Sequence, residues 1–196
     1  MRKYSLAAIA ATAVTLLVCL LSALTEPAIF NQPESLAAEL NWILMRPVAS
    51  RFVIPAVCAL LAALALTRKI SLGMCSLLTL VNLLAYGGYY ALVGGNVFKF
   101  SAWFYNAIEV IFHVSPFWFA AILVLGVVEK KPVVWALSAL GLAMIVFLRS
   151  VVVLAFPQTP AAASSLDIVM GGSLALIALL AVYDWVSRKR VREVLP

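Results

Sequence analysis

The chain has 196 residues, of which 65% are hydrophobic and 11% are charged. An ordinary soluble domain carries about a quarter charged residues, so this composition excludes a water-exposed globular surface and indicates a membrane protein. The formal net charge is +6, but the basic residues stand in short clusters at the ends of apolar runs and form no broad patch, which argues against a nucleic-acid-binding surface.

Apolar runs of about 20 residues recur along the chain, and a helix of that length crosses a bilayer. The first run, residues 4–24, follows Met-Arg-Lys as a secretory signal would, with Ser22 and Ala23 near a candidate cleavage point. Its length favours a retained first helix. The other runs predict five further membrane helices, at residues 52–67, 70–93, 103–128, 133–156 and 166–186.

The segment between the first two expected helices has a pattern of its own. Residues 35–46 carry apolar side chains at helical spacing with polar and charged residues opposite, until Pro47 stops the pattern. This spacing predicts a short amphipathic helix on the outer surface, with Trp42 at the level of the lipid headgroups. The alternative is that the same helix covers the bundle as a lid.

Basic residues orient the expected bundle. In a six-span arrangement the larger basic group falls on one side, against Arg46, Arg51 and Lys99 on the other. That larger group consists of Arg2, Lys3, Arg68, Lys69, Lys130, Lys131, Arg188, Lys189, Arg190 and Arg192. Because cytoplasmic loops are enriched in Lys and Arg, both termini are expected to be cytoplasmic. The predicted fold is an all-α polytopic membrane helix bundle with six transmembrane helices, forming a single domain over residues 1–196.

The chain offers few groups that bind metals or cofactors. Cys19, Cys58 and Cys75 lie inside apolar runs without C-x-x-C spacing, so we interpret them as small packing residues. A single histidine cannot supply bis-histidine haem ligation or a multi-histidine metal centre within one copy. No Walker motif or dinucleotide glycine signature is present, and no cofactor is expected.

Three ionisable residues fall within the expected membrane helices at similar depth. Arg149 is expected roughly 10 Å, Glu109 roughly 6 Å and His113 roughly 12 Å below the outer surface, at about 1.5 Å per helical residue. Glu109 and His113 are spaced i, i+4 and therefore share one helical face with Tyr105. Because charged groups inside hydrocarbon are costly, such residues are candidates for function.

The expected helix 70–93 adds a polar stripe that includes Asn82, Tyr86 and Tyr90. If this stripe and the Glu109 face turn inward, they enclose with Arg149 a polar pocket that opens outward. The predicted ligand-binding residues are Asn82, Tyr86, Tyr90, Tyr105, Glu109, His113 and Arg149.

Three interpretations of these residues remain open. Glu109 and Arg149 form a structural ion pair, or the pocket holds a small polar or anionic solute or a lipid headgroup with Arg149 as the anion contact. The third interpretation is an intramembrane enzyme that uses Glu109, His113 and Arg149. Ser115 and Ser150 are nearby nucleophile candidates, but no G-x-S-x-G elbow surrounds them.

Taken together, these patterns predict a small protein of the cell membrane with an outward-facing polar pocket, acting as a solute- or lipid-binding component of membrane transport. The alternative is a non-catalytic assembly or anchoring subunit that meets another membrane protein. Six helices in about 200 residues with a small-residue first helix are similar, in size and topology but in no motif, to the substrate-binding subunits of energy-coupling-factor vitamin importers. The expected partners are the lipid bilayer, a small polar or anionic solute or a lipid headgroup, and another membrane protein. Nucleic acid is not an expected partner.

Overall fold

The computed structural model describes residues 2–24, 48–93, 100–155 and 160–194, and these residues form helices, with short turns at 67–71 and 129–131. No strand occurs among them. The helices are α1 (Arg2–Leu24), the π-helical turn η2 (Ala49–Val53) that runs directly into α5 (Ile54–Leu66), α6 (Leu72–Val93), α7 (Phe100–Val128), α8 (Pro132–Ala155) and α9 (Pro160–Val194). The all-helical part of the prediction is therefore confirmed.

The helix bounds follow from local chemistry. Pro132 and Pro160 open α8 and α9, where the missing N–H of proline leaves no hydrogen bond unmade. Pro55 is in the first turn of α5, and the wider π turn before it relieves the contact between the proline ring and the carbonyl of Arg51. Pro116 lies inside α7, which continues through it.

Three apolar segments are long enough to cross a membrane among the residues described: Lys3–Ser22, Ala49–Leu66 and Val110–Val128. The apolar stretches Leu72–Gly88 and Pro132–Phe147 are shorter. The last helix is longer than the expected 166–186, since the basic residues after Val186 continue α9 to Val194. The amphipathic helix expected at 35–46 falls outside the described residues.

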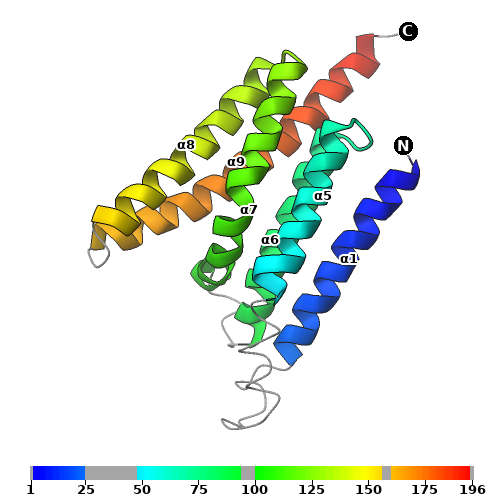
Figure 1. The fold of residues 1–196 in the computed structure, drawn as a ribbon. Helices are drawn as coiled ribbons and strands as arrows, with labels where there is room; N and C mark the ends of the chain where they lie inside the picture. The colour runs from blue at the N-terminus through cyan, green and yellow to red at the C-terminus, as the bar shows by residue number, and fades with distance from the viewer. Residues whose placement is uncertain (1, 25–47, 94–99, 156–159, 195–196) are drawn as a thin grey trace.

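The helices form one bundle with α7 at its centre. Helix α7 packs against α5, α6, α8 and α9, while α1 packs on α6 and α5, and α8 packs on α7 and α9. Figure 1 shows that the first turn of α1, the α5–α6 turn, the α7–α8 turn and the C-terminal part of α9 all lie at one end, which we call the basic end. Its exposed basic residues include Lys3, Arg68, Lys69, Lys130, Arg188 and Lys189.

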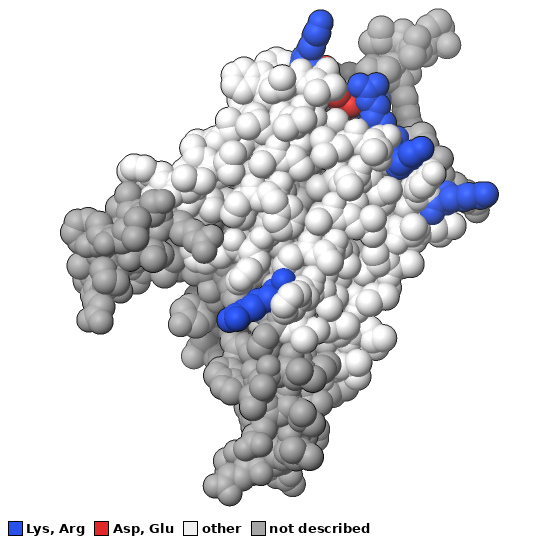
Figure 2. Space-filling view, viewed as in Figure 1, with Lys and Arg blue, Asp and Glu red and all other residues white. Residues whose placement is uncertain are grey.

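Large apolar side chains cover the outside of the bundle as well as its core. Trp118 and Phe119 of α7 are fully buried and meet edge to face with ring centroids 5.3 Å apart. On the outside, Leu17, Phe147 and Leu179 are each more than half exposed. Figure 2 shows a wide uncharged surface between the two ends, with Lys and Arg gathered at the basic end and a further basic side chain lower on this face. So broad an apolar surface is unfavourable in water and suits contact with lipid.

Candidate functional site

The site begins at the first turn of α6, whose backbone N–H groups need acceptors. Ser71 precedes the helix, and its Oγ accepts a hydrogen bond from the Met74 N–H at 3.1 Å, as an N-cap residue does. The Gly73 N–H instead donates to Asp184 Oδ2 of α9 at 2.9 Å. A carboxylate at a helix N-terminus also interacts favourably with the helix dipole. Asp184 thus joins the C-terminal part of α9 to the first turn of α6 through this hydrogen bond.

Asp184 has a second partner one turn along its own helix. Arg188 Nε donates to the same Oδ2 atom at 2.7 Å. The Asp184 side chain is 7% exposed and that of Arg188 is 52% exposed. A buried carboxylate needs such partners because it has lost its contact with water. The pair therefore joins a buried acceptor to a guanidinium that still reaches the surface.

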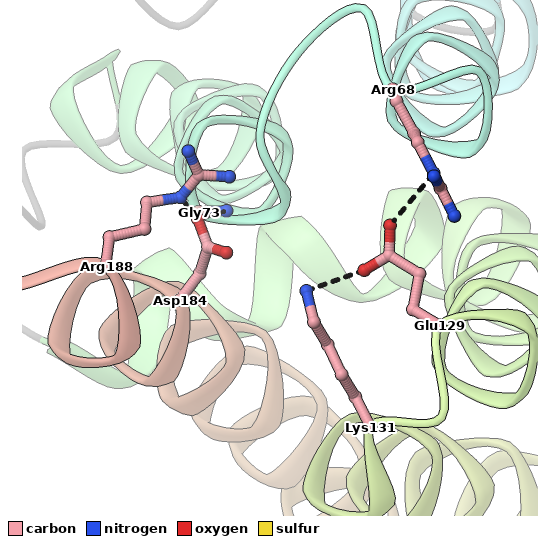
Figure 3. Close-up of polar contacts among 6 residues, drawn as sticks. All are labelled: Arg68, Gly73, Glu129, Lys131, Asp184 and Arg188. Atoms are coloured by element: carbon pink, nitrogen blue, oxygen red, sulfur yellow. Dashed lines mark hydrogen bonds and ion pairs between the residues drawn. The ribbon is translucent and has the colours of Figure 1, made fainter. Parts of the chain in front are cut away.

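A second carboxylate lies at the neighbouring turn. Glu129 stands at the end of α7, with Oε2 2.6 Å from Lys131 Nζ and Oε1 3.4 Å from Arg68 Nε. Lys131 belongs to the same α7–α8 turn, whereas Arg68 comes from the α5–α6 turn. Figure 3 shows Glu129 between these two cations and Asp184 facing Gly73 and Arg188. Glu129 therefore links the two turns through its ion pairs with Arg68 and Lys131.

The two charged groups line one hollow of about 220 Å³, which we call the polar chamber. It lies where the α5–α6 turn, the α7–α8 turn and α9 meet, at the basic end. Its walls consist of Ala65, Arg68, Ile70, Ser71, Leu72, Leu125, Glu129, Lys131, Asp184 and Arg188.

A larger hollow of about 420 Å³ adjoins the polar chamber between α6 and α9, and we call it the apolar cleft. Its lining is formed by Ser71, Gly73, Met74, Leu77, Ala181, Val182, Asp184, Trp185 and Arg188. Ser71, Asp184 and Arg188 line both hollows, so the two adjoin at these residues. Trp185 and Leu77 are both more than half exposed, so the cleft opens on the flank of the bundle.

This arrangement is amphipathic. The chamber presents guanidinium and ammonium groups that hydrogen-bond anions, and the cleft presents thioether, leucine, valine and indole surface. A ligand with an anionic head and an apolar tail matches both parts. The apolar cleft is also within the usual range of small-ligand pockets, about 300–1,000 Å³.

Asn82 and Tyr86, two of the residues predicted to bind ligand, lie buried inside the bundle. Asn82 Nδ2 donates to Thr12 Oγ1 of α1 at 3.1 Å and to the Leu78 carbonyl at 2.7 Å. This places a buried hydrogen bond between α1 and α6. The observed partners of the Asn82 amide nitrogen are therefore protein atoms that hold the bundle together.

His113 lies on an exposed face of α7, whereas Ser115, two residues on, is fully buried. The side chains of Tyr90, Tyr105, Glu109 and Arg149 fall outside the described part of the structure. Helices α7 and α8, which carry Glu109 and Arg149, do pack against each other. The outward-facing pocket itself stays a prediction.

The sequence patterns did not predict a binding role for the residues of the polar chamber. Arg68, Lys131 and Arg188 were interpreted only as orientation signals, and Glu129 and Asp184 were given no role. The available signal was a carboxylate near two of the basic clusters: Glu129 precedes Lys130 and Lys131, and Asp184 is spaced i, i+4 from Arg188. The contact of Asp184 with Gly73 joins residues 111 apart and has no local signature.

The described residues contain no group of three or more His, Cys, Asp or Glu side chains that would hold a metal ion. The three cysteines are buried and form no disulfide in the described bundle. Comparison of the chain with protein-family models, curated proteins and solved structures finds no match.

Proposed function

We propose that the chain is a six-span protein of the cell membrane with both termini cytoplasmic, and that it binds lipid as a component of membrane transport. The arrangement at the basic end supports the topology, because the start of α1, two turns and the end of α9 lie there together (Figure 1). An even number of crossings puts the two termini on one side. The excess of Lys and Arg at that end favours the cytoplasmic face.

One observation carries the lipid-binding function: the apolar cleft adjoins the polar chamber, and Ser71, Asp184 and Arg188 line both. A lipid entering from the side would place an acyl chain along Leu77 and Val182 and its headgroup near Arg188. Basic pockets between membrane helices on the cytoplasmic side are typical sites for anionic lipid headgroups. Trp185 at the cleft mouth suits the interface, where indole rings concentrate.

The cleft can be tested without touching a charged residue. Ala181→Phe places a ring in the apolar cleft, and we expect the purified protein to retain at most a third of the tightly bound lipid of the wild type. Native mass spectrometry from mild detergent counts the lipid bound to each molecule. Ala143→Phe is the matched control, because Ala143 is an exposed alanine of α8 that does not line the cleft.

The thermal midpoint of both variants should stay close to that of the wild type, since the ring of Ala181→Phe would occupy the apolar cleft and that of Ala143→Phe an exposed face of α8. Equal lipid retention by Ala181→Phe and Ala143→Phe would contradict lipid binding in the cleft. A protein companion that copurifies in fixed ratio, with the cleft free of lipid, would favour an assembly subunit instead.

A further inference from the structure

The two arginines that line the polar chamber are held in the same way. Arg188 meets Asp184 Oδ2 through its Nε atom at 2.7 Å, and Arg68 meets Glu129 Oε1 through its Nε atom at 3.4 Å. Each guanidinium carries one N–H on Nε and four on its two Nη atoms. The carboxylates therefore engage the Nε atom of each arginine.

The Nη edge is the part of a guanidinium best suited to phosphate. Its parallel N–H groups match the spacing of two phosphate oxygens and make charge-assisted hydrogen bonds. Arg68 and Arg188 both line the polar chamber, a hollow of about 220 Å³. Figure 3 shows their guanidinium groups apart from each other, with Glu129 and Lys131 between them in this view.

The charge of the chamber narrows the ligand further. Its lining includes three cationic side chains, Arg68, Lys131 and Arg188, and two carboxylates, Glu129 and Asp184, so the net charge is one positive. A phosphodiester carries one negative charge and neutralises this excess. A phosphomonoester carries about 1.5 to 2 negative charges at neutral pH and would leave the chamber negative.

We propose that the polar chamber binds the phosphodiester of an anionic glycerophospholipid through the Nη groups of Arg68 and Arg188. Lys131 adds positive charge, while Glu129 and Asp184 act as positioning residues. The lipid source of the phosphate rests on the function proposed above, because only a lipid also fills the apolar cleft. The phosphate chemistry does not depend on the acyl chains.

The test compares three probes on the purified full-length protein: short-chain phosphatidylglycerol, short-chain phosphatidylcholine and glycerol 3-phosphate. Binding is measured as the ligand-induced rise in thermal midpoint over a concentration series. We expect the wild type to bind phosphatidylglycerol at least 10-fold more tightly than phosphatidylcholine. The zwitterionic choline headgroup brings a cation toward Lys131 and so binds less well.

Arg68→Gln should reduce the preference for phosphatidylglycerol over phosphatidylcholine to less than 3-fold. Arg68→Lys should restore only part of this preference, because an ammonium keeps the charge but lacks the parallel N–H groups of a guanidinium. Arg68 is the first choice because its side chain is 69% exposed, so its loss leaves the fold intact. Lys130→Gln is the matched control. It removes one charge from an exposed residue of the neighbouring turn that does not line the chamber, and the preference should persist.

Each outcome decides between the two proposals. An unchanged preference in Arg68→Gln, or an equal loss in Lys130→Gln, would overturn the arginine site. Equal binding of the two lipids by the wild type would overturn the preference for an anionic headgroup, since both lipids carry a phosphodiester, while leaving lipid binding in the cleft intact. Glycerol 3-phosphate is a phosphomonoester without acyl chains, so its binding as tightly as phosphatidylglycerol would contradict the phosphodiester assignment, the lipid source and the proposed function.

Discussion

Gly73 is the residue on which the geometry of the site depends most closely. A Cβ atom at this position would lie 2.9 Å from Asp184 Oδ2 and 3.4 Å from the Ala181 carbonyl oxygen. The first distance is shorter than side-chain carbons tolerate. A side chain here would therefore separate α6 from α9 and lengthen the hydrogen bond between Gly73 and Asp184.

Gly73→Ala should lower the free energy of unfolding by roughly 1–3 kcal/mol, through overpacking and a weakened hydrogen bond to a buried carboxylate. Thermal unfolding in detergent, followed by circular dichroism, measures the effect. Gly171→Ala is the control, since a Cβ there meets no atom within 4 Å and alanine favours the helix. A midpoint in Gly73→Ala as high as that of Gly171→Ala would show that the close approach does not matter.

Part of the site could be predicted from individual residues of the sequence. Glu129 and Asp184 each lie in a basic cluster, and the spacing of Asp184 and Arg188 allows a helical ion pair. What was not visible is that the clusters meet, because contacts between α5, α7 and α9 depend on how the helices pack. His113 shows the converse: its polarity suggested an inward position, yet its side chain lies on an exposed face of α7.

At the scale of elements, the α5–α6 and α7–α8 turns end their first helices in the same way. Lys69 N donates to the Leu64 carbonyl and Arg68 N to that of Ala65, and Lys131 N and Lys130 N repeat this pattern on α7. This is the Schellman arrangement, in which the residue after the C-cap adopts a left-handed conformation. Arg68 and Lys130 occupy these positions with φ of 56° and 53°, where glycine is usual.

Lys130→Gly should therefore raise the free energy of unfolding by about 0.5–1 kcal/mol, since it removes the left-handed strain of a residue with a Cβ atom. Lys130 is exposed, so little packing is lost. The same thermal measurement applies, with Ala136→Gly, an exposed position inside α8, as the comparison that should lose about 1 kcal/mol. A lower midpoint in Lys130→Gly would mean that the lysine side chain stabilises the turn.

Helix positions were largely predictable because a long apolar run between basic clusters has few alternatives to a helix. The turns after Leu66 and Val128 fall where the basic residues begin, as expected. The end of α9 differs: it continues through its basic cluster to Val194, because Arg188 to Arg192 suit a helix as well as a loop. The π turn at Ala49–Val53 depends on Pro55 and has no periodic signal.

At the scale of the whole molecule, the order of the helices in space could not be read from the sequence. Lipid-facing and buried faces are equally apolar here, so hydrophobic periodicity does not tell which side of a helix meets its neighbours. Small and polar residues decide the packing instead. Gly141, for example, admits the Phe119 ring, and the amide of Asn82 reaches Thr12.

The most direct measurement is a cryo-electron microscopy map of the protein in nanodiscs that contain phosphatidylglycerol and phosphatidylcholine. We expect six helices to cross the disc and a lipid to occupy the apolar cleft between α6 and α9. Its phosphate should lie within hydrogen-bonding distance of the Nη atoms of Arg68 and Arg188, and an acyl chain should lie beside Leu77. An empty cleft at a resolution that shows other annular lipids would contradict lipid binding in the cleft. A lipid whose phosphate lies away from both arginines would contradict the phosphate site.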